Sequence, residues 1–390
     1  MVDADVADLV REARARSGVP GVAVGLWADG RVSTWAEGVL ALGRREPVTV
    51  ATPFRVASIT KMFVAALAAS CLDLEVPLVR EVTVRQLLSH RGGLRCESLE
   101  PLPDEAQGLF SYSNAAYWAV GDACARACGA SFEAAVRERL LAPLGLGATG
   151  FEEPARPARG HLQAGERGHV AVERDTYPVR RFPSGGLWST VGDLLRFAAH
   201  LLGGAGPLSA DVRAALREPQ AEALGARYGL GVWLREAGGE DVVEHEGSAG
   251  GYETLLMLLP QSGRALAVLT NSWRGSVLVR RLLAGLGLGA GRDDDGSGDA
   301  GLADVAALAG GYALDGAEAV LAPARGGLRV GLAETEPVSG ARLTRPPALA
   351  RPLGGGVFGF GGGVLVSHRL DFPRAGIGRF GWVAMPRVSS

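Results

Sequence analysis

The chain has 390 residues, of which 47% are hydrophobic, so it can bury a sizeable core in one large domain with a small one or in two domains of middle size. Its 42 acidic and 40 basic residues nearly cancel and form no basic stripe, which argues against a nucleic-acid binder, because such proteins need clustered positive charge to neutralise phosphates. The 57 glycines follow no repeat, which excludes a collagen-like fibre.

The start of the chain is acidic and lacks the basic residues and apolar run of a secretory signal. No run of about 18 uncharged apolar residues occurs that could span a membrane. Four cysteines are too few for a disulfide framework in so long a chain, and Cys124 and Cys128 have no partners at zinc spacing. We therefore expect a cytoplasmic protein with buried free thiols, no metal, no organic cofactor and no membrane or nucleic-acid partner.

The first predicted elements are a helix, a hairpin and a second helix. Apolar residues at helical spacing predict the first helix over residues 5–16. Residues 21–27 and 31–38 flank an Asp-Gly turn, which is typical of a β-hairpin. Residues 58–67 are apolar on nearly every side, so they predict a helix in the middle of its domain.

The rest of the main domain reads as a helical block followed by strands. Residues 82–215 are mainly helical in pattern, and strand patterns with one closing helix follow at 228–235, 242–246, 252–259, 264–270 and 276–286. Strands therefore lie at both ends of a helical block. We expect an α+β sandwich, in which an antiparallel sheet from both termini is flanked by helices and carries an inserted helical lobe.

Composition divides the chain into three parts. Residues 1–286 form the main domain, with the helical lobe at about 82–215. Residues 287–303 are rich in Gly and Asp and read as a solvated linker. Residues 304–390 hold short alternating segments and many glycines, as in a small all-β barrel or sandwich.

One basic residue differs from all the others. Lys61 is the single lysine among 40 basic residues, and an amine, unlike a guanidinium, can lose its proton near neutral pH when it is desolvated. Ser58 precedes it by three residues, so the two side chains share one face of a helix. A serine hydroxyl needs a neighbouring base to become a nucleophile, and the pair is suited to that chemistry.

Two further segments carry polar residues at short spacings. Tyr112-x-Asn114 opens a helical stretch, and His245-x-Gly247 ends a strand before a Gly-Gly turn. Together with the serine–lysine pair, and in the same order, they resemble the motifs of the serine β-lactamases and penicillin-binding proteins, especially the branch of class C β-lactamases, D-alanyl carboxypeptidases and esterases. The landmark segments 82–94, 141–146 and 185–194 are similar as well, and the resemblance covers about residues 5–286.

The resemblance implies a β-lactamase/transpeptidase-like fold and a covalent acyl-enzyme on Ser58. It implies that Tyr112, with its phenol pKa lowered beside Lys61, is the general base. Asn114 would bind the substrate amide and help to orient Lys61. The backbone N–H groups of Ser58 and Ser248 would form the oxyanion hole.

The same resemblance marks residues around the third motif as substrate-binding candidates. His245 stands where true β-lactamases carry a lysine. Glu246 replaces a small hydroxyl residue and would repel a substrate carboxylate, which argues against β-lactams and a free C-terminal D-alanine and favours an amine-bearing substrate. Gly247 belongs to this set, as do Tyr252 and Trp188, which could line a pocket or simply pack.

Two loop features complete the comparison. The stretch between Leu94 and Phe110 is shorter than expected for the branch, which predicts an open cleft. His90 is expected to brace the loop at Gly92 rather than to do chemistry. Residues 304–390 resemble the small lipocalin-like domain appended to some of these enzymes, with residues 308–312 as its first strand.

The sequence thus predicts a serine-dependent acyl-transfer enzyme that cleaves an ester or amide of a small molecule or peptide. The acyl group could pass to water, as in an esterase or amidase, or to an amine, as in a biosynthetic transacylase. A penicillin-binding-protein-type peptide cyclase or thioesterase is an alternative, and so is a catalytically silent relative that binds a ligand. A metal-dependent hydrolase is disfavoured because no His/Asp/Glu cluster has ligand spacing.

Overall fold

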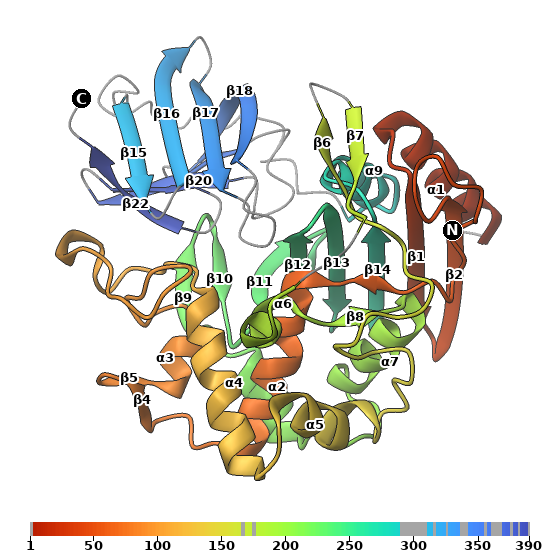
Figure 1. The fold of residues 1–390 in the computed structure, drawn as a ribbon, viewed down its shortest axis with the longest axis horizontal. Coiled ribbons are helices and arrows are strands. Elements are labelled where there is room, and N and C mark those ends of the chain that lie inside the picture. The colour runs from red at the N-terminus through yellow and green to blue at the C-terminus, as the bar shows by residue number, and fades with distance from the viewer. Residues whose placement is uncertain are drawn as a thin grey trace.

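The computed structural model describes residues 3–164, 168–173, 177–288 and the strands between residues 310 and 388 (Figure 1). Its centre is an eight-stranded antiparallel sheet in the order β2-β1-β14-β13-β12-β11-β10-β9, so strands from the two ends of the main domain lie side by side. This confirms the predicted sheet. Its strands are β1 (Gly21–Ala28), β2 (Arg31–Gly38), β9 (Ala221–Ala223), β10 (Ala226–Tyr228), β11 (Trp233–Ala237), β12 (Glu240–Ala249), β13 (Tyr252–Leu259) and β14 (Arg264–Thr270).

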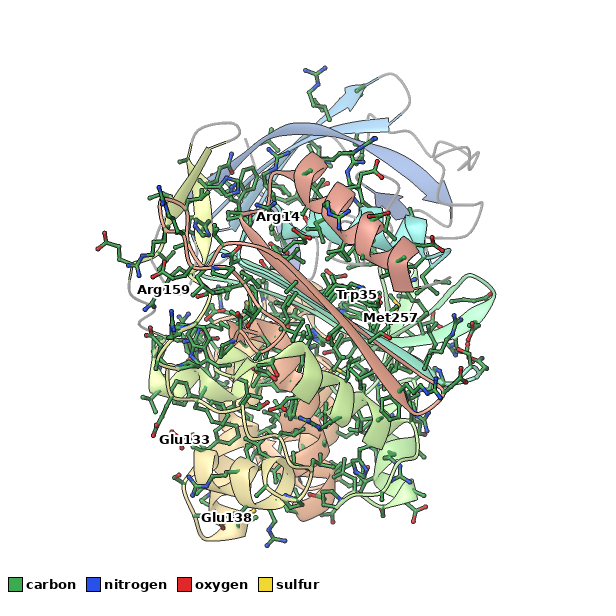
Figure 2. The ribbon with its side chains drawn as sticks, turned by 90° about the vertical axis from the view of Figure 1, so that its right-hand side faces the viewer. Arg14, Trp35, Glu133, Glu138, Arg159 and Met257 are labelled. Atoms are coloured by element: carbon green, nitrogen blue, oxygen red, sulfur yellow. The ribbon has the colours of Figure 1, made fainter. Side chains whose placement is uncertain are left out.

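Helices cover both faces of this sheet. Helices α1 (Asp3–Ser17) and α9 (Gly275–Gly285) lie on one face, and the helical lobe lies on the other (Figure 2). Because successive side chains of a strand point to opposite faces, Leu255 and Met257 of β13 pack in the core under α1 and α9, whereas Leu256 packs in the core of the lobe. Each face therefore has its own apolar core.

The helical lobe surrounds helix α2, whose residues from Thr60 to Ala68 are all buried, as the apolar pattern predicts. Helix α2 spans Thr60–Cys71. The other helices of the lobe are η1 (Ala57–Ile59), α3 (Val84–Leu88), η2 (Asp104–Ala106), α4 (Asn114–Cys128), α5 (Phe132–Val136), the π-helical turn η3 (Arg137–Leu141), η4 (Val179–Arg181), α6 (Phe182–Gly185), α7 (Val191–Leu201) and α8 (Ala210–Leu216).

Short strand pairs complete the lobe. They are β3 (Phe54–Arg55) with β8 (Trp188–Ser189), β4 (Pro77–Val79) with β5 (Val82–Thr83), and β6 (His161–Ala164) with β7 (Gly168–Ala171). The last pair lies inside the segment for which the sequence predicted mainly helix.

The predicted hairpins β1–β2 and β13–β14 are confirmed, and Asp29 and Gly30 turn the first with φ of 51° and 74°. The predicted strand 228–235 is wrong in one respect, because it divides into β10 and β11. Gly231 lies between them with φ of 70°, and a Cβ there would lie 2.7 Å from the backbone oxygen of Lys61. The break lets the chain pass close to helix α2.

The described strands of the C-terminal region form a closed barrel in which β15 pairs with β22. The backbone N–H of Leu224, between β9 and β10, donates a hydrogen bond of 3.0 Å to Oδ2 of Asp371 in the barrel. The expected linker 287–303 falls almost wholly outside the described residues. The barrel strands are β15 (Gly310–Leu314), β16 (Ala317–Ala324), β17 (Gly327–Thr335), β18 (Arg342–Gly354), β19 (Val357–Gly359), β20 (Arg369–Arg374), β21 (Ile377–Phe380) and β22 (Val383–Val388).

Within the described ranges, every helix is too short or too polar to cross a membrane.

Candidate active site

Ser58 lies in the 3₁₀ turn η1, held against strand β12. The preceding residue, Ala57, has φ of 47°, a conformation that L-residues rarely adopt. The backbone oxygen of Val56 accepts a hydrogen bond of 3.0 Å from the hydroxyl of Thr254. A Cβ on Gly247 would lie 2.2 Å from the same oxygen, so only glycine allows η1 to approach β12 this closely.

Lys61 lies one turn after Ser58 and is fully buried. Its Nζ lies 3.1 Å from Oγ of Ser58, 2.8 Å from Oδ1 of Asn114 and 2.7 Å from the backbone oxygen of Ser184. The structure therefore brings together the first motif and the asparagine of the second, from helices α2 and α4.

The amine of Lys61 is poised to lose its proton. Burial lowers its pKa from 10.5 to about 7, and the thiol of Cys96 and the carboxylate of Glu97 oppose this effect. Burial also raises the pKa of Cys96 above its ordinary value, so that thiol stays protonated near neutral pH. Glu97 is thus the neighbour that brings negative charge to Lys61.

Glu97 is a site residue that the sequence analysis missed. Its Oε1 accepts a hydrogen bond of 2.5 Å from Nδ2 of Asn114, and its Oε2 lies 3.2 Å from Arg181. An amide has a donor end and an acceptor end, so the bond to Glu97 directs the oxygen of Asn114 toward Lys61. Glu97 lies in a loop and belongs to no motif, so spacing gave no signal for it.

Tyr112 is buried beside Lys61, whose Nζ lies 4.7 Å from the centre of its ring. The expectation of a lowered phenol pKa is wrong. Burial raises the pKa of Tyr112 well above 10, and the nearby hydroxyl of Ser58 opposes only part of the rise. At the pH at which a phenol ionises, Lys61 has already lost its proton and offers no charge to stabilise a phenolate.

His90 braces the segment that carries Tyr112. Its Nδ1 accepts a hydrogen bond of 3.1 Å from the backbone N–H of Ser113, and its backbone oxygen accepts one of 3.0 Å from Ser111. Its ring lies 4.1 Å from that of Tyr112. These contacts support a bracing role, but for the segment 111–113 and not for the loop at Gly92 that the sequence analysis named.

His245 lies in the core behind Tyr112 and is neutral. Its Nδ1 lies 2.6 Å from the backbone oxygen of Glu246, which can only accept, so this nitrogen carries the proton. Its Nε2 then accepts from the hydroxyl of Tyr228 at 3.2 Å. Burial, with the nearby charge of Lys61, lowers the pKa of His245 to about 3. His245 therefore holds the lysine's place in the motif without its positive charge.

The interpretation of Glu246 as a residue that faces the substrate is wrong. Glu246 pairs across the sheet with Leu255, which packs in the core under α1 and α9, on the face opposite Ser58. The charge of Glu246 acts there on Arg280 of helix α9. The alternation of side chains along β12 sets this outcome, since His245 and Gly247 point to the lobe and Glu246 points away.

Trp188 and Tyr252 pack in the core and do not line the site. Their rings meet edge to face at 5.8 Å, the guanidinium of Arg55 lies 4.5 Å from the Trp188 ring, and the hydroxyl of Tyr252 donates to the backbone oxygen of Ala158. Both are at most 2% exposed. The alternative that they simply pack is the one that the structure supports.

A narrow hollow of about 50 Å³ opens at Ser58. It is lined by Ala57, Ser58, Glu97, Asn114, Tyr177, Arg181, Ser184, Gly185, Ser248 and Ala249. The predicted open cleft is therefore wrong, because Glu97 from the short segment forms part of the wall. Strand β11 pairs with β12 only as far as Glu244, so Ser248 lies on an open edge of β12 beside Ser58.

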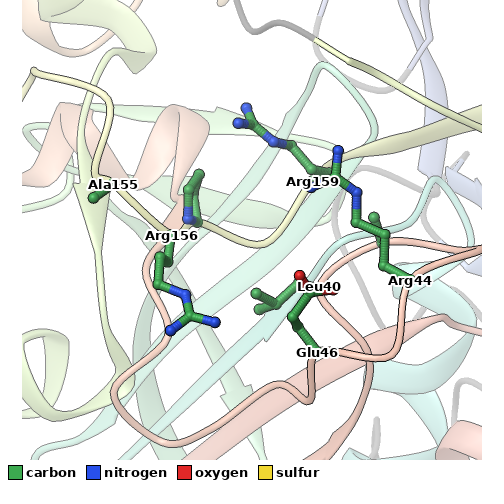
Figure 3. A pocket seen from close by; sticks show the side chains of 8 residues that line it. Leu40, Arg44, Glu46, Ala155, Arg156 and Arg159 are labelled. Carbon is green, nitrogen blue, oxygen red and sulfur yellow. The ribbon is translucent and has the colours of Figure 1, made fainter.

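A larger hollow of about 230 Å³ lies elsewhere, between residues 40–46 and 155–159, and holds none of the predicted site residues (Figure 3). Arg44, Arg156 and Arg159 line it, and Arg159 also pairs with Glu153. The predicted site residues Ser58, Asn114 and Ser248 line the smaller hollow instead. No group of His, Cys, Asp and Glu side chains within the described residues could hold a metal ion.

The structure thus combines a sheet covered by helices on both faces with a serine–lysine–asparagine cluster next to strand β12. Residues 6–288 match the Beta-lactamase family model, and the chain belongs to this family. Its fold is the β-lactamase/transpeptidase-like fold with an additional C-terminal all-β region.

Three relatives illustrate the similarity. Penicillin-binding protein 4 of Amycolatopsis lactamdurans is 28% identical over 313 residues, which are 66% of this chain and 82% of that protein. SurE is 26% identical with a TM-score of 0.72 over 99% of both chains, and a structure of SurE with D-Leu matches at 25% and 0.71 over the same shares. A class C β-lactamase from Rhodobacter sphaeroides is 21% identical, with a TM-score of 0.62 over 72% of this chain and 99% of that one.

Proposed function

We propose that this chain transfers an acyl group from an ester or amide through a covalent intermediate on Ser58, and that the donor is a small molecule or peptide whose reacting residue has the D configuration. The acyl group then passes to an amine or to water. The hydrogen bonds of Lys61 carry the proposal. The similarity to SurE over its whole length, including a structure with D-Leu, supports the choice of a D-configured donor.

The three partners of Lys61 set the direction of its lone pair. The oxygens of Asn114 and Ser184 can only accept hydrogen bonds, so the two N–H groups of a neutral amine point to them. The lone pair then points to the hydroxyl of Ser58 at 3.1 Å. With a pKa of about 7, Lys61 is neutral in a large fraction of molecules at physiological pH. It is therefore the base that takes the proton of Ser58.

The remaining groups serve the later steps. As Oγ of Ser58 bonds to the carbonyl carbon, its proton moves to Lys61, and the N–H groups of Ser58 and Ser248 stabilise the oxyanion. Tyr112 stays protonated because its pKa is raised, so it can pass the proton from Lys61 to the leaving group. The incoming amine or water loses its proton to the same pair when it attacks the acyl-enzyme.

The test is the intact mass of the protein after brief exposure to p-nitrophenyl esters of N-acetyl-D-leucine and N-acetyl-L-leucine. We expect one acyl adduct on the Ser58 peptide, formed faster from the D ester, and faster discharge by amines than by water. Ser58→Ala should form no adduct, whereas Ser70→Ala, a serine of α2 whose hydroxyl bonds only to the backbone of its own helix, should behave as wild type.

Each other result has a definite meaning. Absence of both adduct and p-nitrophenol release would favour the silent ligand-binding relative. Equal rates with the two esters would reject the D-configured donor and keep the acyl-enzyme. Discharge at the same rate with and without amines would identify a hydrolase.

A further inference from the structure

A cluster of three thiols lies at the far end of the helices that supply Lys61 and Asn114. Cys71 is the last residue of α2, and Cys124 and Cys128 lie one turn apart on α4. Cys71, Cys124 and Cys128 belong to one packed cluster, and both α4 thiols lie near enough to Cys71 to affect its pKa, Cys124 more than Cys128. The sequence analysis found no partner for the α4 pair, because Cys71 is 53 residues away from Cys124 along the chain.

The geometry of the two helices independently places Cys71 next to the α4 thiols. Helices α2 and α4 pack against each other (Figure 1), and Lys61 contacts Asn114 at their first turns. Cys71 lies ten residues after Lys61, and Cys124 lies ten residues after Asn114. Each step advances about 15 Å along its helix, so two helices running in the same direction bring the thiols to the same level.

The surroundings of the cluster favour a reactive thiolate on Cys71. Cys71 and Cys128 are partly exposed, whereas Cys124 is buried. The neighbouring thiol of Cys124, with that of Cys128 and the positive charge of Arg139, favours the thiolate of Cys71 more than burial disfavours it, so the pKa of Cys71 falls from 9.0 to about 7. Metal binding is a poorer fit, because no three His, Cys, Asp or Glu side chains among the described residues are placed to hold a metal ion.

We propose that Cys71 is a site of reversible thiol oxidation, which forms a disulfide to the α4 pair and so ties together the two helices that hold Lys61 and Asn114. The oxidant is a hydroperoxide. The Cys71 thiolate attacks the peroxide, an S–O bond forms, the O–O bond breaks, and the hydroxide that leaves takes a proton to become water. A thiol of α4 then attacks the sulfur, an S–S bond forms, and the second oxygen leaves as water. Two thiols are oxidised and one hydrogen peroxide is reduced to two waters.

The first test is the rate at which iodoacetamide labels each cysteine of the reduced, native protein. Cys71 should react at least about tenfold faster than Cys96, because burial raises the pKa of Cys96 and keeps its thiol protonated. The labelling rate of Cys71 should level off above pH 7 to 8. Equal rates, or a Cys71 rate that still rises steeply at pH 9, would overturn the proposal.

The second test is treatment with a small excess of hydrogen peroxide, followed by alkylation and peptide mapping. The number of free thiols should fall from four to two, with Cys71 linked to α4 and Cys96 still free, and dithiothreitol should restore all four. Trypsin cleaves after Arg126 and so separates Cys124 from Cys128, and a second digestion with a glutamate-specific protease, which cleaves after Glu97, separates Cys96 from Cys124. A bridge to either α4 cysteine supports the proposal.

Two variants complete the test. Cys71→Ser should keep all its remaining thiols under the same peroxide treatment, and the variant Cys124→Ala with Cys128→Ala should stop at a sulfenic acid on Cys71. Loss of two thiols in Cys71→Ser, or a bridge that involves Cys96, would refute the assignment. The labelling rates are measured on the unchanged protein. They therefore still test the proposal if a variant fails to fold.

Discussion

Replacing Glu97 by Gln removes one negative charge near Lys61 and keeps the hydrogen bond to Asn114, because the amide oxygen of Gln can still accept from Nδ2, while the ion pair with Arg181 is lost. The path from Nζ of Lys61 to the carboxylate passes through hydrogen bonds of 2.8 and 2.5 Å and one amide, so the charges are about 7 Å apart. At an effective dielectric constant of about 40, this corresponds to about 1.2 kcal/mol, or about one pH unit.

The sign follows from the charges. Glu97 stabilises the ammonium form of Lys61 and so raises its pKa against the larger effect of burial. The rate of acylation requires the neutral amine, so the acidic limb of kcat/KM should lie near pH 7 in the wild type and move about one unit lower in Glu97→Gln.

The assay is kcat/KM for an activated ester between about pH 5 and 9, measured for wild type, Glu97→Gln and Glu100→Gln. Glu100 is on the same loop but exposed, with its carboxylate near Arg80, so its variant should follow the wild-type profile. An acidic limb of Glu97→Gln at the same pH as in the wild type, or at a higher pH, would refute the reasoning. So would an equal shift of the limb in Glu100→Gln.

Further predictions concern three other positions. Gly247→Ala should prevent acylation and lower the Tm, because its Cβ would lie 2.2 Å from the oxygen of Val56, while Gly192→Ala, with nothing nearer than 3.9 Å, should change neither; normal acylation in the first variant would contradict the close approach of η1 to β12. Tyr112→Phe should lower kcat/KM by about 10²- to 10⁴-fold with an unchanged Tm, and a loss below about threefold would remove Tyr112 from the proton path. Glu246→Gln should change KM for carboxylated and for uncharged esters by less than about twofold, since its side chain lies on the opposite face of the sheet; a selective gain with carboxylated esters would restore the sequence-based interpretation.

Local patterns predicted much of the fold. The Asp29-Gly30 turn, the alternation on either side of it and the apolar run of α2 depend on neighbours a few residues apart, so the sequence predicts them directly. The pairing of Ser58 with Lys61 is of the same kind, because helical spacing alone places both on one side.

The face on which a strand residue points and the protonation of a buried group depend on distant contacts instead. Glu246 points to α9 because alternation along β12 places it opposite His245, whose cross-strand partner Leu256 packs in the core of the lobe, and the motif does not show this packing. Tyr112 has a raised pKa because residues from several segments exclude water from it.

The same reason explains the residues that the sequence analysis missed. Glu97 reaches Asn114 from a loop 17 residues away, and Cys71 reaches Cys124 because two helices run side by side. The sequence by itself determined the Ser58–Lys61 pair, which follows from local spacing, and the order of its motifs pointed to the family that the comparison shows. Only the tertiary structure decided which groups share a water-free site, because desolvation and charge act through space and not along the chain.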